Sequence, residues 1–169
     1  MITLLVTLSV ARVNSQTDLT IFREKNIAVD SFTKLIVKSK LRIVLVESDQ
    51  LDSIRIEGNN NFVDKVFVAQ SRDKLLVRSI GFKDLKKEGT IYIPVRSLQS
   101  IEVLDDAKII SFSIINSPIL DLLIQGDCTV SIILKGKLNI IKGEDYTYSF
   151  RRITKNSNTP TYQQSIFNH

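Results

Sequence analysis

The sequence predicts an all-β protein built as a parallel β-helix or β-roll-like stack of short strands. The chief observation is a repeat, in which a short apolar run, an acidic or glycine-bearing turn and a second apolar run recur roughly every 20 residues, over residues 100–109, 122–130 and 139–148. No stretch of a dozen residues shows the apolar period of three to four that indicates an amphipathic helix. An antiparallel β-sandwich is the alternative, but the similar register of the three turns favours stacked coils.

Length and composition indicate one domain and exclude several classes of site. The 169 residues, 43% of them hydrophobic, suffice for one core. The net charge of +5 is spread along the chain without a basic cluster interleaved with aromatics, so we expect no nucleic-acid partner. Cys128 is the single cysteine, which excludes an internal disulfide, and His169 is the single histidine, which removes most arguments for a metal site or for a Ser/His or Cys/His pair. We interpret Cys128 as a small core or turn residue.

The chain opens on an apolar run that resembles the core of a signal peptide. Residues 1–13 are too few to span a bilayer as a helix. Val13 and Ser15 fit the two positions that a signal peptidase reads, so we expect residues 1–15 to be removed and the mature chain to begin at Gln16. No Lys or Arg precedes the run, which leaves an N-terminal core strand as the alternative. Without a lipid-attachment cysteine near Gln16, we expect a periplasmic, cell-surface or secreted protein with no membrane span.

The β-domain is predicted to cover residues 16–150, after a polar lead-in over residues 18–26. Apolar residues on both faces of residues 41–46 indicate a covered strand, and Ile54 and Ile56 indicate a half-exposed one that ends in a turn at residues 58–61. A hairpin follows, with its turn at residues 70–74. The strands predicted in this half span residues 32–37, 41–46, 54–57, 66–68 and 75–77.

The second half is predicted to hold the repeated coils and a polar tail. Residues 81–89 form a charged surface loop, and Pro94 places its strand at an edge or bend because proline donates no ladder hydrogen bond. Breaks are expected at residues 116–118 and 135–137. Residues 151–169 contain little apolar material and are predicted to form a disordered or loosely docked tail. The strands predicted here span residues 91–95, 109–115, 119–124, 130–134 and 138–141, and the inward-facing core positions include Leu122, Ile124, Val130, Ile132 and Ile140.

Four features occur in a fixed order along the chain: Phe32, Leu35 and Val37 of the first strand, Leu75 and Val77, residues 91–94 (Ile-Tyr-Ile-Pro), and the recurrent turns. This order resembles a known family, the bacterial putative auto-transporter adhesin head domain, or head GIN domain. The resemblance covers roughly residues 32–143 and implies an exported, β-helix-like stack without a catalytic motif. The turns of the family usually read glycine, small, serine, whereas the turns of this chain are acidic.

The acidic turns are the candidate site. Stacked coils would bring Asp105, Asp106, Asp127, Glu144 and Asp145 close together. Such oxygens suit a hard cation such as calcium, or paired carboxylates for sugar hydrolysis, but solvated turns without a ligand explain the same pattern. We therefore expect no cofactor, with calcium as the alternative.

The last repeat carries alternating aromatic residues, and the chain lacks the family's further glycine-rich coils. Tyr146, Tyr148 and Phe150 are predicted to cap the last coil rather than to form a sugar-stacking platform. The function predicted from these observations is an exported, non-enzymatic, adhesin-like binding module of the cell envelope, with a surface glycan or a protein as partner. A carbohydrate-active enzyme on a β-helix and a self-assembling homo-oligomeric surface unit are the alternatives.

Overall fold

The computed structural model describes residues 22–48, 52–81, 85–86, 88–126, 128–142, 148–152 and 161–165. The predicted signal peptide and the start at Gln16 lie outside these residues. The described elements are strands except for one short helix, which confirms the all-β fold class. They are β1 (Phe22–Ala28), β2 (Lys34–Lys38), β3 (Arg42–Glu47), β4 (Ser53–Asn59), α1 (Asn60–Lys65), β5 (Val66–Ser71), β6 (Lys74–Ser79), β7 (Gly89–Val95), β8 (Ser100–Val103), β9 (Lys108–Ile124), β10 (Thr129–Lys142), β11 (Tyr148–Arg152) and β12 (Thr161–Ser165).

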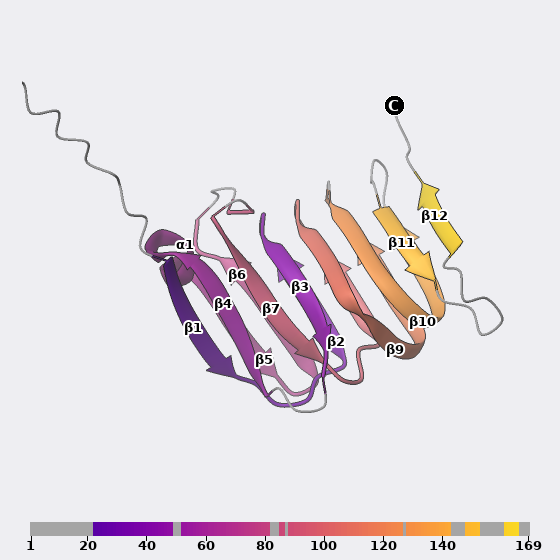
Figure 1. Cartoon of the computed structure of the whole chain (residues 1–169), viewed down its shortest axis with the longest axis horizontal. Coiled ribbons are helices and arrows are strands. Elements are labelled where there is room, and N and C mark those ends of the chain that lie inside the picture. The colour runs from indigo at the N-terminus through magenta and orange to yellow at the C-terminus, as the bar shows by residue number, and fades with distance from the viewer. Residues whose placement is uncertain are drawn as a thin grey trace, which may run out of the picture.

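The described strands form one 12-stranded sheet that folds over at the long, bent strands β9 and β10 (Figure 1). The first part of β9 pairs with β3, and its last part pairs with β8. We call the side with β1, β4, β7, β3, β11 and β12 the front wall, and the side with β5, β6, β2 and β8 the rear wall. β9 and β10 belong to both walls, so the chain winds around a nearly closed, barrel-like core.

Successive coils stack in parallel, as the repeat predicted. Lys108 pairs with Thr129, so the coil from β9 to β10 comprises 21 residues when counted from the start of β9, and Asp121 pairs with Asn139, so it comprises 18 when counted from the last part of β9. The predicted repeat length of roughly 20 residues lies between these two coil lengths. Antiparallel pairs flank the stack, between β1 and β4, β4 and β7, β5 and β6, and β11 and β12. The predicted hairpin is the β5–β6 pair.

The apolar faces of the coils meet in one continuous core. Of the predicted positions, Leu122, Ile124, Val130 and Ile132 are buried, and Ile140 is partly buried against the same cluster. Cys128 is buried too, as expected of a small core residue. A coil cannot bury its apolar face alone, so each one is stabilised chiefly by its neighbours.

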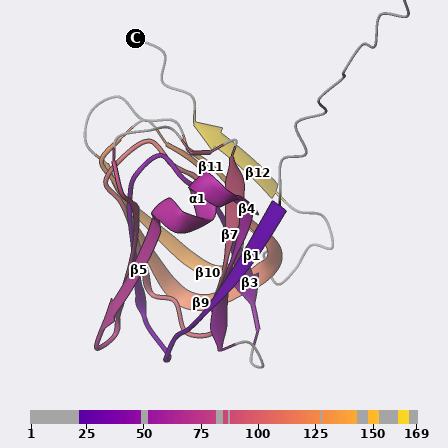
Figure 2. The same ribbon diagram turned by 90° about the vertical axis from the view of Figure 1, so that its left-hand side faces the viewer.

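The turn predicted at residues 58–61 is wrong, because β4 runs to Asn59 and α1 starts at Asn60. The Asn59 side chain accepts a hydrogen bond from the Phe62 amide at 2.8 Å and caps the helix. Phe62 and Val63 are fully buried. Figure 2 shows α1 across one end of the barrel. The helix therefore closes the core at this end of the stack, as terminal caps do in solenoids.

Two further predictions are corrected and one is refined. Residues 116–118 and 135–137 bend without interrupting β9 and β10, so the breaks are corners within strands. The prediction for Pro94 was an edge or a bend: β7 as a whole lies between β4 and β3 and is not an edge strand, but at Pro94 only β3 is paired with it. Pro94 is tolerated there because the β4 ladder stops at Tyr92. The predicted polar tail contains β12, which pairs with β11.

Candidate functional site

The turns of successive coils stack at one corner of the barrel. The Lys108 amide donates to the Leu41 carbonyl, and the Thr129 amide donates to the Ala107 carbonyl, each at 2.8 Å. A Cβ placed on Gly126 would lie only 2.8 Å from the Asp105 backbone, so the two turns are in close contact. These hydrogen bonds bring together the β2–β3 turn and the two acidic turns that follow β8 and β9.

The carboxylates at this corner have partners within the protein. Asp106 Oδ2 lies 2.9 Å from Lys40 Nζ, and Asp105 Oδ1 accepts the Asp106 amide hydrogen at 2.8 Å. Among the residues that the structure describes, no group of three or more His, Cys, Asp or Glu side chains is placed to hold a metal ion. Asp127, Glu144 and Asp145 lie outside the described residues. The five-residue acidic site and its calcium alternative therefore stay predictions.

The aromatic cap predicted from Tyr146, Tyr148 and Phe150 also falls largely outside the described structure. Tyr146 lies outside the described residues, and for Tyr148 and Phe150 only the backbone is described, in β11. β11 pairs in parallel with β10, through Phe150 and Ile132 among others, and so adds a strand to the stack. The cap itself stays a prediction.

A groove of about 220 Å³ lies on the outer face of the front wall, and sequence reasoning missed it. We call it the front groove. It is lined by Asn26, Val46, Ser53, Arg55, Tyr92 and Pro94. Alternation along the strands explains the set: Ile91 and Ile93 point into the core, so Tyr92 and Pro94 point outward. Outward apolar residues at alternate positions of residues 91–95 were the signal available in the sequence.

The front groove combines an apolar surface with polar groups. Arg55 and Tyr92 are paired in register across β4 and β7, and the Arg55 guanidinium carbon lies 4.4 Å from the centre of the Tyr92 ring. Arg55 Nε is also 3.0 Å from Glu57 Oε1, so the guanidinium is held from a second side. Ser53 and Asn26 add a hydroxyl and an amide.

A second, larger hollow of about 710 Å³ lies where the rear wall meets the corner of stacked turns. Its lining is mainly basic and hydroxylic. We call this cavity the corner hollow. It is lined by Lys38, Ser39, Lys40, Leu76, Arg78, Ser79, Gly81 and Asp105. The predicted acidic site touches this hollow through Asp105.

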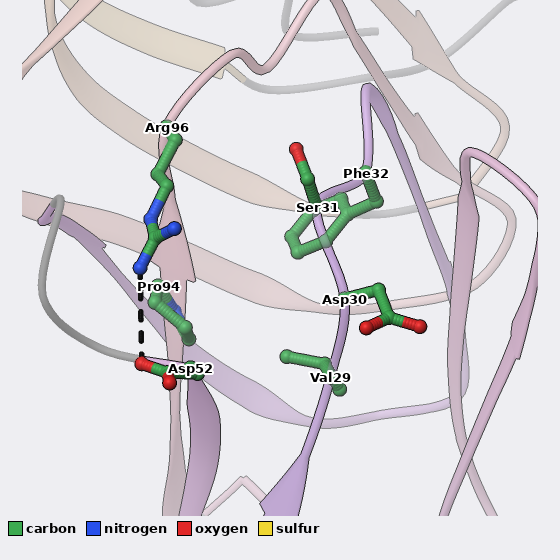
Figure 3. Close-up of a pocket in the computed structure, with 7 residues that line it drawn as sticks. All are labelled: Val29, Asp30, Ser31, Phe32, Asp52, Pro94 and Arg96. Carbon is green, nitrogen blue, oxygen red and sulfur yellow. Dashed lines mark ion pairs between the residues drawn. The ribbon is translucent and has the colours of Figure 1, made fainter.

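Figure 3 shows a third, much smaller pocket beside the end of β7. Its volume of about 30 Å³ is close to that of one water molecule. Arg96 reaches along one side of it to Asp52, with 3.7 Å between Nη2 and Oδ1, and residues 29–32 form the opposite side. The Arg96 Nε also donates to the Ser48 carbonyl at 3.2 Å. This pocket is too small for a ligand.

The comparisons with known proteins decide the family. A family model described as "putative auto-transporter adhesin, head GIN domain" matches residues 31–142, about two thirds of the chain. The chain belongs to the head GIN domain family. The match spans the stacked coils from β2 to β10, together with the corner hollow, and ends before β11. No curated protein matches the sequence.

Solved structures similar to this chain include three putative adhesins. The one from Bacteroides fragilis is 17% identical, with a TM-score of 0.55, over 71% of this chain and 61% of its own length. The putative adhesin from Parabacteroides merdae is 15% identical, with a TM-score of 0.47, over 70% of this chain and 57% of its own length. The one from Parabacteroides distasonis is 14% identical, with a TM-score of 0.49, over 77% of this chain and 70% of its own length. The chain thus spans about three fifths of the length of the first two. At these identities the B. fragilis structure supports the fold alone.

The described part of the chain contains no helix long and apolar enough to cross a membrane.

Proposed function

We propose that this head GIN chain is an exported, non-enzymatic, adhesin-like binding module of the cell envelope, and that it holds a surface saccharide in the front groove. Family membership supports an adhesin-like role. The interior of the barrel is packed with apolar side chains, so a ligand has to bind on the outer surface.

The chemistry of the front groove is the observation that carries the proposal. Sugar rings have apolar faces and hydroxyl-bearing edges, so they need apolar contact and hydrogen-bond partners side by side. Val46, Pro94 and the Tyr92 ring supply the apolar contact, while Arg55 and Asn26 supply donors at the rim. The stacking of Arg55 on Tyr92 holds both side chains in place, which reduces the conformational entropy lost when a ligand binds.

A carbohydrate-active enzyme is the rival function. Glycoside hydrolysis requires two carboxyl groups roughly 5–9.5 Å apart on either side of the scissile bond. The six described residues of the front groove include no carboxylate, and the Asp105 and Asp106 carboxylates already have partners at the corner. These facts favour binding over hydrolysis.

A panel of cell-surface polysaccharides, assayed for binding and for release of reducing ends, separates the two functions. We expect saturable binding to at least one polysaccharide without turnover. Asp127→Asn is the matched variant, because Asp127 is the acidic-turn residue that a hydrolytic mechanism would use. Turnover by the parent that disappears in Asp127→Asn would refute the binding-module proposal.

A self-assembling surface unit is the third possibility, and one observation favours it. Among the described strands, β12 pairs with β11 alone, so its other edge is open to a further strand. Light scattering across a concentration series tests this point: a mass that grows with concentration supports assembly through the edge, and a constant monomer mass supports a solitary binding module.

Export is tested on the protein from its native envelope. Intact-mass measurement should give the mass of a chain that begins at or near Gln16. A retained Met1 would contradict export through a cleaved signal peptide.

A further inference from the structure

The corner hollow contains two neighbouring cations that have no acidic partner among the described residues. Lys38 of β2 and Arg78 of β6 are directly opposite each other in the parallel register, and both line the hollow. Within the described part of the chain, neither side chain forms an ion pair with a carboxylate. Arg78 instead lies over the Phe67 ring, 4.6 Å from its centre. Like charges at laterally paired positions repel each other.

A second pair of cations lies between the same two strands, and one of its members has a carboxylate partner. Lys34 of β2 is opposite Lys74 of β6. Lys34 Nζ, however, forms an ion pair with Glu102 Oε2 at 2.6 Å, which neutralises one of the two charges. Among the residues that the structure describes, the pair in the corner hollow has no such carboxylate.

The base of the hollow is fixed and hydroxylic. Ser39 and Ser79 are buried, and the Ser79 amide donates to Ser39 Oγ at 2.9 Å, which ties β6 to the β2–β3 turn. Lys40 stands at the same turn and is held by Asp106. Lys38 and Arg78 therefore start from paired positions on adjacent, hydrogen-bonded strands, so the backbone holds the two side chains next to each other.

We propose that the corner hollow is a binding site for an oxyanion, a sulfate or phosphate group carried by an acidic surface polysaccharide, with Lys38 and Arg78 as its principal ligands. The lining residues include no aromatic side chain on which a nucleic-acid base would stack. Asp105 in the wall accepts hydrogen bonds, which suits the hydroxyl groups of a sugar. This site is separate from the front groove, so each of the two proposals can fail without the other.

The test is a titration of the full chain with dextran sulfate, with uncharged dextran as the ligand control. Lys38→Gln combined with Arg78→Gln removes the proposed ligands. Lys74→Gln combined with Lys108→Gln removes the same charge from two exposed lysines outside the hollow, so it controls for the general field of the protein. Chemical-shift mapping with inorganic sulfate and with inorganic phosphate then locates the site of the small anion.

We expect dextran sulfate affinity to fall at least about tenfold in the hollow variant and by less than about threefold in the control, because contact charges contribute more than screened distant ones. The hollow variant should melt close to the temperature of the parent, because the relief of the like-charge pair is offset by the loss of the Arg78 contact with the Phe67 ring. Inorganic sulfate and phosphate should each shift the amides of residues 38–40 and 78–81 first. Equal losses in the two double variants, binding of uncharged dextran, or shifts spread over the whole basic surface would each overturn the proposal.

Discussion

Gly136→Ala is the substitution that most sharply tests the stacking of corners between β9 and β10. Gly136 has a φ of +143°, and a Cβ on it would lie 1.6 Å from the Ser117 carbonyl oxygen of the preceding coil. No side-chain rotation relieves this contact, because the backbone fixes the positions of both the Cβ and the carbonyl oxygen. The corner of β10 must then move away from the corner of β9.

The magnitude follows from two separate effects. A non-glycine residue in this region of φ and ψ costs about 1–3 kcal/mol by itself, and overpacking against a fixed neighbour costs about 1–3 kcal/mol more. Gly136→Ala should therefore destabilise the protein by roughly 2–6 kcal/mol. Gly81→Ala isolates the first effect, because Gly81 has a φ of +92° with no atom within 4 Å of an added Cβ. Its cost should stay at about 1–3 kcal/mol.

Urea denaturation of the parent and the two variants measures both costs. The comparison requires equal m-values, since a changed slope would signal a different denatured or native state. We expect Gly136→Ala to be less stable than Gly81→Ala by at least about 1 kcal/mol. Equal stability of the two variants would show that the corners at Ser117 and Gly136 are not in contact, and the stacking would be wrong at this point.

The remaining predictions concern the core, the cap and the acidic turns. Ile124→Ala should cost roughly 2–5 kcal/mol in the same denaturation assay, because Ile124 is fully buried between coils; a parent-like melt would mean that the repeat register is wrong. Asn59→Ala should cost about 1 kcal/mol, whereas Asn59→Ser should keep most of the helix cap without adding a charge beside Glu88; equal losses would exclude capping as the reason. Asp127→Asn should change stability little, with or without calcium, and a calcium-dependent stabilisation that only this variant loses would establish the cation site.

The repeat was predictable because its cause is local and periodic. Apolar residues at alternate positions and turns at coil spacing define which side chains point inward, so Leu122, Ile124, Val130 and Ile132 could be placed in the core from the sequence. The same reasoning could not show that residues 116–118 remain within β9. Residues such as Ser117 and Pro118 occur both in loops and at corners within strands. Whether the strand continues through them depends on its pairing with the neighbouring coil.

The cap and the two surface hollows depend on contacts distant in sequence. α1 has six residues, too few for a periodic signal, and it is stabilised mainly by burying Phe62 and Val63. The front groove and the corner hollow each combine strands that meet only in the folded sheet. Lys38 and Arg78, for example, are opposite each other because β6 joins the stack next to β2, an order that the repeat did not reveal.

The most direct test of the proposed function is the affinity of front-groove variants for the polysaccharide that binds best in the panel, measured by isothermal titration calorimetry. Tyr92→Ala and Arg55→Ala remove the two stacked side chains, and Phe112→Ala removes an exposed aromatic residue of the same wall outside the groove. We predict that each groove variant loses at least about tenfold in affinity, as residues at the centre of a binding site do, while Phe112→Ala stays within about threefold of the parent. Parent-like binding by both groove variants, or an equal loss in Phe112→Ala, would contradict saccharide binding in the front groove.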